Sequence, residues 1–137
     1  MNIKGIAAAL ALAAGVALPG CQSEPMRDLT ADFESLFGSA KGEPALAAGL
    51  KQYEDGSYND AAKQIQTALS QGLSTPDRVK AHKYLAFIDC VTDRMSACRD
   101  EFRKALAIDP SLELAPAEAG HPIWGPVFRS VKSGSGR

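Results

Sequence analysis

From residue 44 onward, apolar side chains recur at the three- and four-residue spacing of amphipathic helices. The spacing predicts four helices, near residues 44–54, 57–71, 76–92 and 94–108. No alternation of apolar and polar positions is long enough for a β-strand. We therefore expect an all-α fold, with one helical domain over residues 44–132.

Short polar segments separate the four predicted helices. The turns are expected at residues 55–56, 72–75 and 92–93, where glycine, aspartate, serine and threonine gather. Thr75 is the expected N-cap of the third helix, because Pro76 suits the first helical position that follows it.

The first pair of predicted helices carries small and apolar residues where two helices of a hairpin must approach closely: Gly49, Gly56, Tyr58, Ala61, Ala68 and Leu69. A second copy of the pattern, displaced by 37 residues, ends in Ala-Leu-Ala-Ile-Asp-Pro at residues 105–110. The pattern resembles the tetratricopeptide repeat (TPR), whose period is about 34 residues. The resemblance implies two TPR-like helical hairpins, a short α-solenoid. This chain has Asp93 where the family usually has a turn glycine, and Cys98 where it usually has alanine.

Two repeats alone leave an apolar end exposed, so a further element must cover it. The strongly apolar stretch near the C-terminus is the candidate, a capping segment in which Pro126 suits the first turn of a short helix. Its apolar residues are Ile123, Trp124, Val127, Phe128 and Val131. Residues 133–137 have the composition of a disordered tail.

The first twenty residues have the proportions of a secretory signal, with one basic residue, Lys4, and an apolar run over 6–18 that is too short to span a bilayer. The run ends in Leu18-Pro19-Gly20-Cys21, which resembles the lipobox of bacterial lipoproteins. That resemblance implies a signal peptide over residues 1–20, cleavage before Cys21, and lipid attachment there by a diacylglycerol and a further acyl chain such as palmitate. Several acyl chains together hold a protein firmly on a membrane.

Residues 21–43 read as a lipidated tether with a candidate short helix. Leu29, Phe33, Leu36 and Phe37 share one helical face, so the segment either docks on the domain or serves as a spacer. Gln22 follows the cysteine, whereas an aspartate there tends to retain lipoproteins in the inner membrane. The family rule therefore favours the outer membrane, on its periplasmic face.

Charge and motifs narrow the function classes. Without Lys4 the mature chain has 14 basic against 16 acidic residues, a net charge near −2, which gives no support for nucleic-acid binding. No catalytic or phosphate-binding motif occurs, so we expect neither an enzyme, nor a cofactor, nor a small-molecule substrate. His82 and His121 lack nearby partners at metal-ligand spacing, and no metal site is expected.

The cysteine count bears on the fold of the mature chain. Acylation of Cys21 leaves Cys90 and Cys98, which flank the predicted turn at 92–93. A disulfide between them is permitted in an oxidising periplasm. The alternative is two buried, small apolar side chains.

Partner-binding candidates follow from the repeat alignment, which places fixed positions of each first helix on an inner groove. These residues are Leu46, Leu50, Tyr53, Lys80, Lys83 and Phe87, joined by Trp124 and Phe128 of the tail. An apolar floor with two lysines suits a protein segment that carries acidic residues. The alternative is that the chain's own N-terminal or C-terminal segment fills the groove.

The longer stretch over 78–132 resembles a smaller family, the TPR lipoproteins encoded beside type VI secretion systems (the TssQ-like group). The resemblance rests on His-Lys-Tyr-Leu-Ala-Phe-Ile at 82–88, on Cys90 and Cys98, and on Gly-His-Pro-Ile-Trp-Gly-Pro-Val-Phe at 120–128. It implies an accessory component of that apparatus, with secretion components of the envelope as partners. A general envelope-assembly or peptidoglycan-associated TPR lipoprotein is the alternative.

Overall fold

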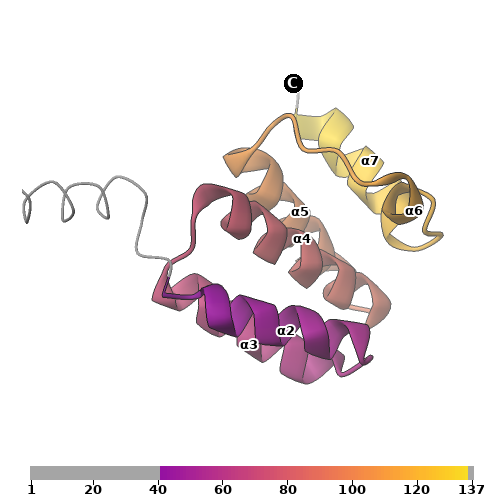
Figure 1. Cartoon of the computed structure of the whole chain (residues 1–137). Coiled ribbons are helices and arrows are strands. Elements are labelled where there is room, and N and C mark those ends of the chain that lie inside the picture. Colours follow the sequence, from indigo (N-terminus) through magenta and orange to yellow (C-terminus); the bar gives the residue numbers. More distant parts are fainter. Residues whose placement is uncertain (1–40, 136–137) are drawn as a thin grey trace, which may run out of the picture.

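The computed structural model describes residues 41–135, and these form six α-helices with no β-strand among them (Figure 1). The expected all-α fold is therefore confirmed. The helices are α2 (Glu43–Glu54), α3 (Tyr58–Gln71), α4 (Thr75–Val91), α5 (Met95–Ile108), α6 (Pro116–Ala119) and α7 (Trp124–Ser135). The predicted signal peptide, Cys21 and most of the predicted tether lie outside the described residues.

The four helices predicted from periodicity agree with α2 to α5 to within one residue at each end. The expected N-cap of α4 is wrong. Ser74 caps the helix, since its Oγ accepts a hydrogen bond from the Asp77 backbone N–H at 3.3 Å, while Thr75 is the first helical residue. Pro76 thus occupies the second position of the helix, where its missing N–H also costs no hydrogen bond.

Helices α2 and α3 form the first hairpin, and small residues let them approach closely. Gly49 is buried, and a Cβ at this position would lie 2.7 Å from Ile65 Cγ1 and 3.1 Å from the Ala61 carbonyl oxygen. The tight packing explains why the sequence has glycine and alanine at these positions. Around this contact lies a buried cluster that includes Leu46, Ile65 and residues of α4.

The turns of the two hairpins have equivalent backbone hydrogen bonds, displaced by 37 residues. Ser57 N donates to Gln52 O at 2.8 Å, as Arg94 N donates to Asp89 O at 2.8 Å. Two further backbone hydrogen bonds repeat with the same displacement. The N–H of residue 55 donates to the carbonyl of residue 51, as that of residue 92 does to residue 88. The N–H of residue 61 donates to the carbonyl of residue 57, as that of residue 98 does to residue 94. The left-handed position also repeats, with φ of +77° at Gly56 and +64° at Asp93. Asp93 therefore adopts a conformation that favours glycine.

Helices α4 and α5 form the second hairpin, which stacks on the first through one face of α4. Ala81, Leu85 and Ile88 of that face are buried against residues of α2 and α3. Figure 1 shows the stacking order, from the indigo and magenta helices of the first hairpin to the yellow C-terminal helix.

Helix α7 packs on the second hairpin in the way that α4 packs on the first. Its buried residues Trp124, Phe128 and Val131 have the same i, i+4, i+7 spacing and lie in a second cluster with residues of α4 and α5. The expected capping segment is thus present, and its helix begins at Trp124, which places Pro126 in the first turn as predicted. The helix also continues through Ser135, so a disordered tail from residue 133 is wrong for residues 133–135.

Candidate functional site

The predicted partner-binding residues fall into two groups in the structure. Five lie on a surface made by α2 and α4, which we call the α2–α4 face: Leu46, Leu50, Tyr53, Lys80 and Lys83, together with the neighbouring Tyr84. The other three, Phe87, Trp124 and Phe128, lie in the core.

A hollow of about 210 Å³ opens between α2 and α4. Leu46 and Leu50 supply apolar lining, and Lys80 is exposed beside them; the remaining lining residues are Glu43, Ala47 and Asp77. Leu46 is buried against α3, so Leu50 and Lys80 are the predicted residues that a partner would meet first. The hollow combines an apolar floor with a cation at its rim.

Lys80 is positioned by the first turn of α4. Its Nζ lies 3.2 Å from Asp77 Oδ1, and both groups face solvent enough for water to screen the pair. Asp77 also accepts a hydrogen bond from the Ser74 hydroxyl at 2.8 Å, and this bond, followed by that of Lys80, lowers the pKa of Asp77. The aspartate is therefore ionised at neutral pH, and Lys80 keeps donor capacity for a further carboxylate.

Two tyrosines continue the α2–α4 face beyond the hollow. The rings of Tyr53 and Tyr84 meet edge to face, with centroids 5.1 Å apart. Burial, and then the neighbouring phenols Tyr58 and Tyr84, raise the pKa of Tyr53 to about 12. Burial also raises the pKa of Tyr84, with Glu118 as the next cause. Both phenols stay protonated at neutral pH and present hydroxyl donors.

Lys83 is already engaged by the C-terminal segment. Its Nζ donates to Glu118 Oε1 at 2.7 Å, and both side chains are largely buried. The same ammonium lies 5.3 Å from the centre of the Tyr84 ring and 5.7 Å from that of Phe87. Lys83 therefore ties α4 to α6, and Lys80 is the lysine that remains open.

Phe87, Trp124 and Phe128 correct the predicted contact surface. Their exposed fractions are only 1%, 8% and 3%. The Trp124 ring stacks on Phe87 at 4.4 Å, and its Nε1 donates to the Glu118 carbonyl oxygen at 2.8 Å. At this end of the predicted groove the chain's own C-terminal segment occupies the place expected for a partner. The sequence did not distinguish the two, because apolar residues at helical spacing suit a core as well as an interface.

Six aromatic rings form a continuous row that crosses the first hairpin, the second hairpin and the C-terminal segment. It runs Tyr58, Tyr53, Tyr84, Phe87, Trp124 and His121, with successive ring centres 5.6, 5.1, 5.6, 4.4 and 3.3 Å apart. The row begins in the first hairpin, crosses α4 and ends beside α7. It therefore joins the α2–α4 face to the cap.

The predicted disulfide is confirmed. The Sγ atoms of Cys90 and Cys98 are 2.01 Å apart, and the Cα atoms are 5.1 Å apart, across the turn of the second hairpin. Both residues are buried, so the bond closes the hairpin from within the core.

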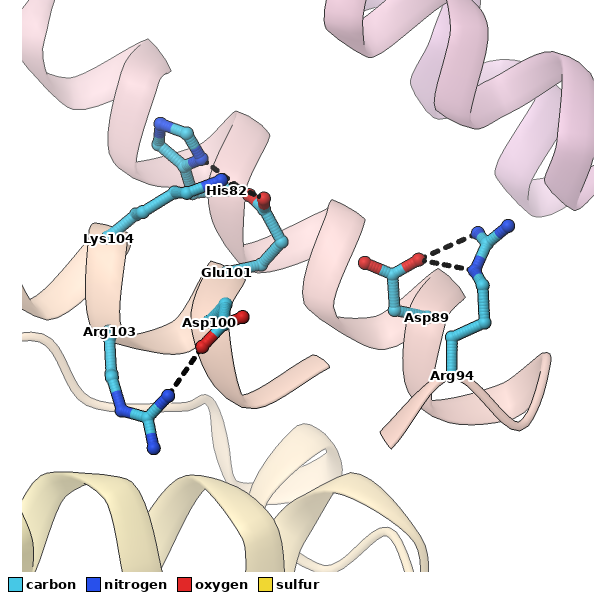
Figure 2. Close-up of polar contacts among 7 residues, drawn as sticks. All are labelled: His82, Asp89, Arg94, Asp100, Glu101, Arg103 and Lys104. Atoms are coloured by element: carbon cyan, nitrogen blue, oxygen red, sulfur yellow. Dashed lines mark hydrogen bonds and ion pairs between the residues drawn. The ribbon is translucent and has the colours of Figure 1, made fainter. Parts of the chain in front are cut away.

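Both histidines contact other side chains. His82 Nδ1 lies 2.6 Å from Glu101 Oε2, and the His121 ring stacks on Trp124 with centres 3.3 Å apart (Figure 2 shows the His82 pair). Between residues 41 and 135, no three side chains of the kinds that bind metals gather at one point.

The sequence interpretation missed the polar contacts between α4 and α5. Glu101 bonds His82 and Lys104, and the buried Asp89 accepts bonds from Arg94 Nε at 2.9 Å and from a terminal nitrogen at 2.7 Å (Figure 2). Burial raises the pKa of Asp89, and Arg94 opposes this effect. Residues 82 and 101 are 19 positions apart, so no local spacing reveals their contact, whereas Asp89 and Arg94 flank a predicted turn.

Comparison with known proteins found no matching family model, no matching curated protein and no matching solved structure. Within the part of the chain that the structure describes, none of the helices has the length and apolar character needed to cross a membrane. Functional interpretation therefore depends on the residues and geometry given above.

Proposed function

We propose that this chain is a lipid-anchored adaptor of the tetratricopeptide type, which binds a protein partner at the α2–α4 face. The observation that carries the proposal is the internal repeat: two helical hairpins with equivalent turns 37 residues apart, one stacked on the other. Arrays of this kind present extended surfaces for other proteins. The TPR-like sequence pattern over residues 42–111 supports the same assignment.

The chemistry of the face defines the kind of partner. Leu50 offers apolar contact, Tyr53 and Tyr84 offer neutral hydroxyl donors, and Lys80 offers a cation with spare donor capacity. An extended or helical protein segment with apolar and acidic residues matches this set.

The anchor and the setting belong to the same proposal. Cys21 would hold the protein by lipid on the outer membrane, facing the periplasm, and residues 22–40 would set the reach of the face from the membrane surface. The resemblance over 78–132 supports an accessory role in a type VI secretion system, with envelope components of that system as partners. The Cys90–Cys98 disulfide agrees with an oxidising compartment.

The test of partner binding is a crosslinking pull-down from membranes, which compares the wild-type chain with Lys80→Glu. Lys63→Glu is the matched control, since Lys63 is also an exposed lysine paired with an aspartate three residues earlier, at 3.5 Å, but lies on α3. Lys80→Glu should lose the crosslinked partner and Lys63→Glu should keep it. Equal capture by both variants would show that the α2–α4 face is not the contact surface.

Anchor and setting are tested separately. Cys21→Ser should move the protein from the membrane fraction to the soluble fraction; retention on membranes would refute the lipid anchor.

Deletion of the protein should abolish type VI-dependent killing of a competitor strain, with restoration by the wild-type chain. Unchanged killing would refute the secretion role and favour the general envelope-assembly alternative.

A further inference from the structure

A second hollow, of about 390 Å³, lies beside α7, on the opposite side of the second hairpin from α2 and α3. Its floor is formed by apolar and small residues, among them Leu114 and Phe128, and its rim carries the cations Arg129 and Lys132. The other lining residues are Glu113, Ala119, Gly125 and Ser133. We call this site the α7 hollow. Figure 1 shows the segment before α6 passing along α7 at this end of the fold.

The repeat geometry tells which kind of element fits the hollow. In α4, one face (Ala81, Leu85 and Ile88) packs on the preceding hairpin, and the adjacent face (His82, Ala86 and Cys90) packs on α5. The second face begins one residue after the first, and α5, the second helix of the hairpin, packs on it.

Helix α7 repeats the first of these faces, and the short helix α6 covers only the start of the second, where the Ala119 carbonyl lies against Gly125. Trp124, Phe128 and Val131 pack on the preceding hairpin, as Ala81, Leu85 and Ile88 do in α4. The residues that correspond to His82, Ala86 and Cys90 are Gly125, Arg129 and Ser133, and all three line the α7 hollow. Within residues 41–135 the four-residue helix α6 and the segment before it cover part of this face, and no longer helix packs along it.

The charges at the rim select the occupant. Arg129 is exposed and donates to the Ala119 carbonyl oxygen at 3.2 Å, and Lys132 contacts the Leu112 carbonyl oxygen and Glu113. Glu113 is the carboxylate among the lining residues, so the rim keeps one net positive charge. The α7 of a second copy would bring Arg129 and Lys132 against their own counterparts, which disfavours self-association through this helix.

We propose that the α7 hollow binds an amphipathic helix of a protein partner, whose acidic side chains face Arg129 and Lys132. The helix lies along the part of this face that α6 and the segment before it leave open, on the side of α7 that corresponds to the α5 side of α4. The α7 hollow is separate from the α2–α4 face, so this proposal does not depend on whether that face binds a partner.

The test is selection from a displayed library of helical peptides of 14 residues, the length of α3 and α5, on the full mature chain. Binders are counter-selected on Ser133→Trp, which fills the hollow. Ser70→Trp is the matched control: Ser70 and Ser133 are both exposed helical serines whose hydroxyls donate to the carbonyl three residues earlier, at 2.7 and 3.0 Å. Circular dichroism of both variants checks that each one folds.

The selected peptides should share an apolar stripe at helical spacing with flanking acidic residues. Their affinity should fall about tenfold or more in Ser133→Trp, fall in Arg129→Glu, and stay unchanged in Ser70→Trp and in Lys80→Glu. Peptides that bind Ser133→Trp as well as wild type, or that lack acidic residues, would overturn the proposal. Loss of binding in Lys80→Glu alone would assign the peptides to the α2–α4 face and would also overturn it.

Discussion

Trp124 connects the cap to the rest of the fold, and its removal is the sharpest test of the structure. In Trp124→Ala the ring that stacks on Phe87 is lost, together with the hydrogen bond from Nε1 to the Glu118 carbonyl oxygen.

The magnitude follows from burial. A tryptophan side chain buries roughly 150–250 Å², and at about 25 cal/mol per Å² this contributes about 4–6 kcal/mol. The lost hydrogen bond adds about 1 kcal/mol. Because α7 lies at the end of the array, water can reach part of the vacated space, and we expect a net loss of about 3–5 kcal/mol, the usual range for removal of a large aromatic side chain.

The assay is urea unfolding followed by far-ultraviolet circular dichroism, on the wild type, Trp124→Ala and Trp124→Phe. The phenylalanine variant keeps a ring on Phe87 and loses the Nε1–H donor, so its loss should be much smaller, about 1 kcal/mol beyond the small difference in ring area. A loss below about 1 kcal/mol in Trp124→Ala would refute the reasoning and return Trp124 to the partner-contact surface.

Three further predictions concern the second hairpin. Asp93→Gly should raise the free energy of unfolding by about 0.5–1 kcal/mol, because φ is +64° at this turn, and Asp93→Val should lower it; urea titration checks both. Replacement of Cys90 and Cys98 by alanine should cost about 2–3 kcal/mol, close to the effect of a reductant on the wild type, since the bond closes a short loop. Burial is the largest single effect and opposes the charge of Glu101, but the hydrogen bonds and charges of His82 and Lys104 together outweigh it and lower the pKa of Glu101. The carboxylate then stabilises the fold above pH 4.5 and loses this effect as pH falls through the lowered pKa, so Glu101→Gln should flatten the fall in stability with acid; an unchanged pH profile would contradict this.

Much of the helical framework was predictable because it depends on local patterning. The ends of α2 to α5 follow from periodicity, and the turn at Asp93 follows from its place 37 residues after Gly56 in the internal repeat. The N-cap of α4 was missed because Pro76 is tolerated at either of the first two helical positions, so the proline does not distinguish Ser74 from Thr75. Helix α6 has only four residues and gives no periodic signal.

The candidate site was less predictable, because its composition depends on contacts between distant residues. The aromatic residues of the tail were equally compatible with a partner surface and with a core, and only the stacking of Trp124 on Phe87 decides between them. The pair of Lys83 with Glu118 spans 35 positions. It removes one of two lysines from the predicted groove, and no local pattern in the sequence indicates which one.

The row of aromatic rings from Tyr58 to His121 has a consequence for how the protein unfolds. In linear arrays, each unit is stabilised by its own contacts and by those at the junction with its neighbour. Here ring contacts at both junctions (Tyr53 with Tyr84, and Phe87 with Trp124) make each boundary between units part of the aromatic packing. A unit that opens exposes rings of its neighbour, so the two hairpins and the C-terminal segment should unfold together in one cooperative transition. A destabilising substitution at one end should therefore also lower the stability of the other end.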